Sequence, residues 1–209
     1  MTLPIAAAGV PVVGLDRSPA MLAVARRKAG GAANPRWVEG DMADFRLDER
    51  FGLAIIPFRS FLLLLTAAEE KACLGRIRDH LVEGGRLALN IFNPDLLKIA
   101  GWLGAERPRR EQAPAAALAG GGRREQWHTR RYLTASQELE EERIEEGLGD
   151  AGAIVTRVSR HLRLRYVFRY EMEHLLALSG FEVEGLYGWF DRRPFGDDSA
   201  EMVWLARRR

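Results

Sequence analysis

A short apolar run that ends in an acidic residue and leads at once into a helix constrains this chain more than any other feature. Val10 to Leu15 is almost wholly apolar, as expected of a parallel strand that is covered on both faces. Asp16 follows it, Ser18 then offers a helix N-cap, and Pro19 suits the first helical position. A carboxylate at the carboxyl end of such a strand can accept hydrogen bonds from both hydroxyls of a ribose. The feature therefore predicts an α/β sheet with a nucleoside site at its edge.

The alternation of strands and helices continues through the first hundred residues. Strands are predicted at residues 36–39, 53–56 and 86–92, and the capping box Thr66 to Glu69 opens a helix that runs to about His80. Such alternation predicts a parallel, doubly wound sheet.

The pattern changes after residue 100. Residues 104–122 are rich in Ala, Gly, Pro and Arg, which predicts a mobile connection. Segments typical of antiparallel strands follow: a basic one at 126–133, an acidic one at 138–146 and an alternating one at 154–168. We expect ion pairs between the basic and acidic strands, and one apolar face on the third. A helix at 170–179 and two strands at 181–190 and 201–206 close the chain. The prediction is a single domain over residues 1–209, with a linker and an antiparallel β insert at about 104–168.

Composition excludes several classes of protein. A net charge of +2 provides no global field for nucleic acid or a membrane surface, and no apolar run reaches 18 residues. The one cysteine, Cys73, excludes an internal disulfide and favours a reducing compartment, so we expect a cytoplasmic protein. No cluster of His, Cys and Asp has the spacing of metal ligands, and no metal is expected.

Polar residues gather at the predicted strand ends. Four ends fall on one edge of the sheet, at Asp16, Asp41, Pro57–Arg59 and Asn90–Asn93. Open α/β sheets bind ligands at this edge. Asp41 can accept a hydrogen bond from the exocyclic amine of a purine, Met42 can offer a backbone N–H, and Met21 an apolar surface. Each aspartate alone could simply cap a turn or a helix, but the two together favour a nucleoside pocket.

On these segments the chain resembles the class I S-adenosylmethionine-dependent methyltransferases, of the small-molecule type with a β insert. The resemblance runs from Ala6 to Arg208 and rests on Gly14–Leu22, Glu39–Met42, Ile56–Phe61 and His80–Asn90. It implies a Rossmann-like, seven-stranded sheet with an antiparallel last strand. It also implies S-adenosyl-L-methionine as the cofactor and methyl transfer to a small-molecule acceptor.

The resemblance also assigns roles to residues. Asp16 would bind the ribose, Asp41 the adenine amine and Met42 the adenine edge, while Pro57 and Phe58 would line the donor side near the methyl group. The cofactor-binding candidates are thus Asp16, Arg17, Met21, Asp41, Met42, Pro57 and Phe58.

One part of the family pattern has no counterpart in the chain. The family's first strand and glycine-rich loop bring backbone N–H groups to the methionine part of the cofactor. Only nine residues precede Val10, and Gly9 is their single glycine. The missing strand would lie between the strands that end at Asp16 and Pro57. We therefore expect an N-terminally truncated chain with a gap in the middle of its sheet.

The acceptor side is predicted from the residues that could cover the pocket. Methyl transfer mainly requires alignment of acceptor, methyl and sulfur, and a hydroxyl or ammonium acceptor must also lose a proton. Arg59, between Phe58 and Phe61, is a candidate for recognising an acidic acceptor, and Tyr187 is a second candidate in a closing strand. Further candidates are Tyr166, Arg169, Tyr170 and Trp189. Trp189 and each tyrosine, Tyr187 included, could instead pack a core or an edge.

Two alternative functions stay open at this stage. An acid after such a strand also suits a nicotinamide-dependent oxidoreductase, and the lack of a glycine loop suits a non-catalytic Rossmann-like binding module. The segment Gly40–Met42 and the strand exit at Pro57 favour the methyl donor. The acceptor and the oligomeric state are left open.

Overall fold

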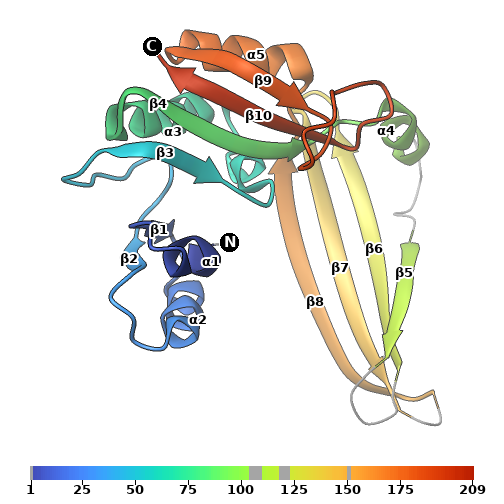
Figure 1. Ribbon diagram of the computed structural model, residues 1–209. Coiled ribbons are helices and arrows are strands. Elements are labelled where there is room, and N and C mark those ends of the chain that lie inside the picture. The colour runs from blue at the N-terminus through green and yellow to red at the C-terminus, as the bar shows by residue number, and fades with distance from the viewer. Residues whose placement is uncertain (1, 104–109, 118–122, 150–151) are drawn as a thin grey trace.

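The computed structural model describes residues 2–103, 110–117, 123–149 and 152–209, and its strands form three sheets (Figure 1). A two-stranded sheet has the order β1-β2, and a four-stranded main sheet has the order β3-β4-β10-β9. The third sheet, β5-β6-β7-β8, is the insert.

The N-terminal unit consists of α1 (Thr2–Ala7), β1 (Val13–Asp16), α2 (Pro19–Ala29) and β2 (Arg36–Glu39). The predicted start of α2 is confirmed, because the Ser18 side chain accepts a hydrogen bond from the backbone of Met21. The strands β1 and β2 are parallel, with Gly14 opposite Trp37. A Cβ atom at Gly14 would collide with the Trp37 ring, so close packing of the pair requires glycine.

The main sheet contains β3 (Phe51–Ile56), β4 (Leu81–Phe92), β9 (Phe181–Tyr187) and β10 (Glu201–Arg208). The pair β3–β4 is parallel, whereas β10 is antiparallel to both neighbours, as expected of the last strand. Two helices, α3 (Ala67–His80) and α5 (Arg169–Leu178), pack on one face of this sheet. The hydrophobic core forms where these helices meet the sheet, and it includes Phe61, Cys73, Leu74, Leu89, Ile91, Met172, Leu176, Met202 and Trp204.

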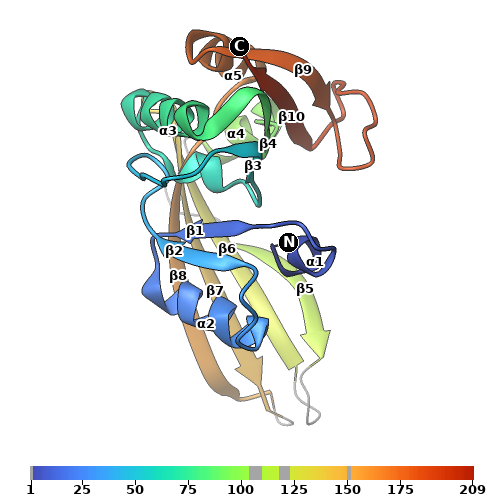
Figure 2. The same cartoon turned by 60° about the vertical axis from the view of Figure 1, so that its left-hand side comes forward.

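The sheet is interrupted between β1 and β3. Both are edge strands, and within the described residues no strand lies between them. Figures 1 and 2 both show the β1–β2 unit standing below β3, joined to it by the chain that follows β2. The single seven-stranded sheet implied by the resemblance is therefore wrong for this chain, because among the described residues no ladder of backbone hydrogen bonds joins β1 to β3. The α/β, Rossmann-like class is confirmed, with the break where the sequence predicted it.

The insert follows α4 (Leu96–Trp102) and consists of β5 (Arg110–Ala117), β6 (Arg123–Leu133), β7 (Glu138–Leu148) and β8 (Ile154–Arg165). Neighbouring strands are antiparallel, and the sheet extends away from the main sheet in both views. A mobile connection was the wrong prediction for residues 110–117, since pairing with β6 makes them a strand. The rest of that segment, 104–109 and 118–122, lies outside the described residues.

The expected ion pairs between the basic and acidic strands are confirmed. Arg130 Nε lies 2.8 Å from Glu141 Oε2, and Arg131 Nη1 lies 3.5 Å from Glu140 Oε2. The apolar face expected on the third segment is wrong for most of its length. Its members Ile154, Val158 and Leu162 are exposed, because this part of β8 extends away from the main sheet, whereas Leu164 near the end of β8 packs against the core.

Candidate functional site

The carboxyl ends of β1 and β2 bring Asp16 and Asp41 to the same edge. The backbone N–H of Gly40 donates to the Asp16 carbonyl over 3.1 Å, which aligns the two strand ends. Asp16 Oδ1 accepts from the Ser18 N–H at 2.9 Å, and Asp41 Oδ1 accepts from the Ala43 N–H at 2.8 Å. Both aspartates therefore cap turns. Since an ionised carboxylate has two oxygens and about four acceptor positions, capping fixes its orientation and leaves capacity for a ligand.

The other predicted residues of this half lie around the same edge. Arg17 is exposed in the turn between β1 and α2, and Met21 is exposed on the first turn of α2. Met42 follows Asp41, but its side chain packs against the main core. Its contribution to a ligand at this edge would therefore come from its backbone.

His80, at the end of α3, anchors the segment that carries Asp41. Its Nε2 accepts from the Leu47 N–H at 2.9 Å, and its Nδ1 lies 2.6 Å from the Arg76 carbonyl. These partners require a neutral imidazole with its proton on Nδ1. The ring also stacks on Phe45, with 4.6 Å between centroids. The sequence contains no signal for this contact, since it joins residues 33 positions apart.

The second half of the predicted site is the exit of β3. Phe58 and Arg59 have φ angles of +58° and +61°, which place two consecutive non-glycine residues in the left-handed region. That conformation costs about 1–2 kcal/mol per residue. A short helix, η1 (Ser60–Leu63), follows, and Ser60 Oγ donates to the Pro57 carbonyl over 2.8 Å. Phe58 is 77% exposed. Strained backbone of this kind is concentrated at functional sites.

Arg59 is paired with Glu201, the first residue of β10. Arg59 Nε donates to Glu201 Oε1 over 2.9 Å, and Nη2 donates to the same oxygen. Asn90 Nδ2 donates to the other oxygen, Oε2, over 3.0 Å. The carboxylate of Glu201 therefore already balances the charge that was expected to recognise an acidic acceptor. Glu201 had no role in the sequence prediction, because a contact across 142 residues leaves no local pattern.

Comparisons with known proteins bear on this arrangement. A family model described as a methyltransferase domain matches residues 1–85. The structure of the CcbJ methyltransferase from Streptomyces caelestis is similar with a TM-score of 0.78 and 25% identity, covering 99% of this chain and 78% of that one.

The chain is a methyltransferase with a Rossmann-like fold. CalS10, an amino pentose methyltransferase from Micromonospora echinaspora solved with bound S-adenosylmethionine, is similar with a TM-score of 0.70 and 24% identity, over 95% of this chain and 74% of that one. The glycopeptide N-methyltransferase MtfA, solved with S-adenosylhomocysteine, is similar with a TM-score of 0.64 and 22% identity, over 100% of this chain and 76% of that one. No curated protein matches the chain. The matches favour a methyltransferase over an oxidoreductase or a non-catalytic module.

In the methyltransferase, Tyr187 does not lie beside Phe58. It ends β9 at the carboxyl edge, but β4 and β10 separate β9 from β3. Three strand spacings correspond to about 14 Å. The Tyr187 ring lies over Gly185, where an added Cβ would be 2.7 Å from its Oη atom.

The remaining acceptor candidates make aromatic contacts with their neighbours. Tyr166 is buried, and its ring centroid lies 5.8 Å from that of Phe168. Burial raises the pKa of Tyr166 above its ordinary value, which makes it a weak proton donor. The Arg169 guanidinium lies 5.0 Å from the Tyr170 centroid, and the Trp189 centroid 5.4 Å from that of Phe190.

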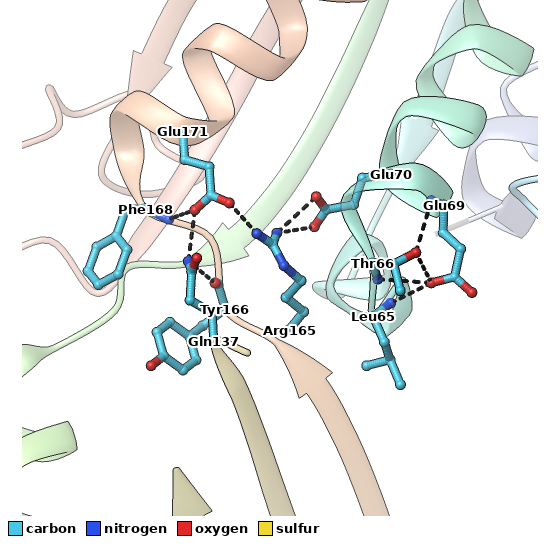
Figure 3. A network of polar contacts seen from close by, with 9 residues as sticks. All are labelled: Leu65, Thr66, Glu69, Glu70, Gln137, Arg165, Tyr166, Phe168 and Glu171. Carbon is cyan, nitrogen blue, oxygen red and sulfur yellow. Dashed lines mark hydrogen bonds and ion pairs between the residues drawn. The ribbon is translucent and has the colours of Figure 1, made fainter. Parts of the chain in front are cut away.

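Arg165, the last residue of β8, fastens the insert to both helices of the core (Figure 3). Its Nη1 donates to Glu70 Oε1 and Oε2 on α3 over 2.7 and 2.9 Å, and its Nη2 donates to Glu171 Oε1 on α5. Glu171 Oε2 also accepts from Gln137 Nε2 over 2.9 Å, at the turn between β6 and β7. The network therefore fixes where the insert stands relative to the main sheet.

The pKa values of the two carboxyl groups in this network, Glu70 and Glu171, are shifted in opposite directions. Burial raises the pKa of Glu70 from 4.5 to about 7, against the opposing effect of Arg165. Burial also acts to raise the pKa of Glu171, but hydrogen bonds from Gln137 and Arg165 hold it below its usual value.

Within the part of the chain that the structure describes, no three His, Cys, Asp or Glu side chains are placed to hold a metal ion. In the same residues, no helix combines the length and apolar character needed to span a membrane.

Proposed function

We propose that this methyltransferase takes its methyl group from S-adenosylmethionine and transfers it to a small-molecule acceptor. The observation that carries the proposal is that two aspartates lie at the same edge of adjacent parallel strands: Asp16 ends β1, and Asp41 follows the end of β2. Two ribose hydroxyls and an exocyclic adenine amine are hydrogen-bond donors that carboxylates suit. The complexes of CalS10 with S-adenosylmethionine and of MtfA with S-adenosylhomocysteine support the same donor here.

Each half of the site would hold a different part of the donor. Asp16 would accept the ribose hydroxyls and Asp41 the adenine amine, with the Met42 N–H at the adenine edge. Arg17 and Met21 flank this end. Pro57 and the exposed Phe58 would line the other end, where an aromatic face attracts the cationic sulfonium. The donor would thus bridge the interval between β1 and β3, and it supplies an activated methyl group when bound.

For the acceptor, we propose a small molecule with an amine or a hydroxyl group. The names of CalS10 and MtfA, an amino pentose methyltransferase and a glycopeptide N-methyltransferase, support an amine. Arg59 and Tyr187 are proposed on the acceptor side, where their separation across the sheet would let them contact different parts of the acceptor. The chain's main task is alignment, since in-line transfer depends on near-attack geometry.

We also propose that the enzyme is cytoplasmic and that it acts without nucleic acid. The single cysteine and the net charge of +2 support both statements.

The test is transfer of an isotope-labelled methyl group from S-adenosylmethionine to a panel of amino sugars, other small amines and small hydroxyl compounds. Labelled small-molecule product is expected from the wild type, and none from the double variant Asp16→Asn, Asp41→Asn. Label on RNA instead, or binding of a nicotinamide dinucleotide in place of S-adenosylhomocysteine, would overturn the proposal.

A further inference from the structure

We infer that Glu201 is a positioning residue for the donor side of the site, acting through Arg59 to fix the left-handed turn that presents Phe58. The inference rests on the proposed function, because it takes Phe58 to face the methyl donor.

The turn at Phe58 and Arg59 requires contacts with other parts of the chain to stabilise its backbone conformation. Both residues have φ near +60°, a region that only glycine visits without steric cost. The Phe58 side chain is 77% exposed, so packing of its own ring does not hold it there. The turn persists only if its neighbours over-determine it.

Glu201 supplies that constraint through hydrogen bonds to Arg59. Its carboxylate is 3% exposed and receives Arg59 Nε on one oxygen and Asn90 Nδ2 on the other. Since bonds from a guanidinium to a carboxylate are charge-assisted, they are stronger than neutral ones. The Arg59 guanidinium also lies 5.6 Å from the Phe92 ring centroid. The exit of β3 is thus tied to the ends of β4 and β10, at the edge where the donor is proposed to bind.

Arg86 and Glu184 form another ion pair in the same sheet, and this purely structural pair serves as a matched control. Arg86 Nε donates to Glu184 Oε2 over 2.7 Å, joining β4 to β9. This pair has the same chemistry as Arg59–Glu201 but involves no residue at positive φ. Arg86 is also in the amino-terminal half of β4, away from the carboxyl ends of β3 and β4.

The experiment measures the affinity for S-adenosylhomocysteine by titration calorimetry in the wild type and in Glu201→Gln, Phe58→Ala, their double variant and Glu184→Gln. We expect Glu201→Gln and Phe58→Ala each to weaken binding about tenfold, with the double variant no weaker than Phe58→Ala alone. Glu184→Gln should leave the affinity within about twofold. Such non-additivity is the signature of a residue that acts through another.

A second measurement needs no ligand. Trypsin cleavage after Arg59 should be several-fold faster in Glu201→Gln than in the wild type, and unchanged in Glu184→Gln. If Glu201→Gln does not fold, Arg59→Gln is the replacement variant. It removes the same ion pair by changing the half-exposed partner, and it should give the same loss of affinity for S-adenosylhomocysteine.

The outcomes separate the two levels of inference. Unchanged affinity in Glu201→Gln, or additive losses in the double variant, overturns the positioning role while the proposed function stands. Wild-type protein that does not bind S-adenosylhomocysteine overturns the proposed function and the positioning role with it, whatever the protease result.

Discussion

Replacing Glu70 with glutamine should change how the stability of the fold depends on pH. Glu70 is 1% exposed, and its pKa is raised from 4.5 to about 7, chiefly by burial. A carboxyl group with a higher pKa in the folded state binds its proton more tightly there than in the unfolded chain. Its contribution to stability is therefore full below pH 4.5 and is lost as the pH rises to about 7. At about 1.4 kcal/mol per pH unit, the loss across that range is about 3 kcal/mol.

The assay is urea unfolding of the wild type and Glu70→Gln at several pH values between 4 and 8, read as the free energy of unfolding. Relative to the wild type, the variant should gain about 3 kcal/mol between pH 4.5 and pH 8, because glutamine has no proton to lose. Glu171→Gln is the control with opposite sign. Its carboxyl pKa lies below the usual value, so the wild type gains stability from Glu171 above pH 4.5 and loses it as the pH falls. A difference between the wild type and Glu70→Gln that stays constant with pH would refute the reasoning.

Two further substitutions test the packing and capping described above. Gly14→Ala should lower the free energy of unfolding by about 1–3 kcal/mol, because the added Cβ meets the Trp37 ring, whereas Gly75→Ala, in open space on α3, should not lower it. Equal changes in the free energy of unfolding for Gly14→Ala and Gly75→Ala would show that the contact with Trp37 does not affect stability. Thr66→Ala should cost about 1 kcal/mol by removing the capping box of α3, and Thr66→Ser should keep most of it; an alanine variant as stable as the wild type would contradict the cap.

Features encoded locally were predictable from the sequence. The N-caps Ser18 and Thr66 lie where the helices begin, because capping depends on residues within one turn. The edge that gathers Asp16 and Asp41 also followed from the sequence, since parallel strands end on the same side of a sheet.

Features that depend on distant partners were not predictable. The strand β5 forms in an Ala- and Gly-rich segment because β6 pairs with it, and composition does not report pairing. His80 anchors the segment that carries Asp41, and Glu201 accepts hydrogen bonds from Arg59. Both contacts join residues that are far apart in the chain. For the same reason, the sequence predicted that Arg59 recognises an acidic acceptor, whereas the fold gives it a carboxylate partner in Glu201.

The most direct test of the account is the affinity of the wild type, Asp16→Asn, Asp41→Asn and Asp44→Asn for S-adenosylhomocysteine, measured by titration calorimetry. Asp44 is the control, because it is an exposed aspartate of the same segment that pairs with Arg76 and has no proposed ligand contact. The account predicts that the wild type binds, that Asp16→Asn and Asp41→Asn each bind at least about tenfold more weakly, and that Asp44→Asn matches the wild type. Wild-type protein that does not bind, or four proteins with equal affinities, would contradict it.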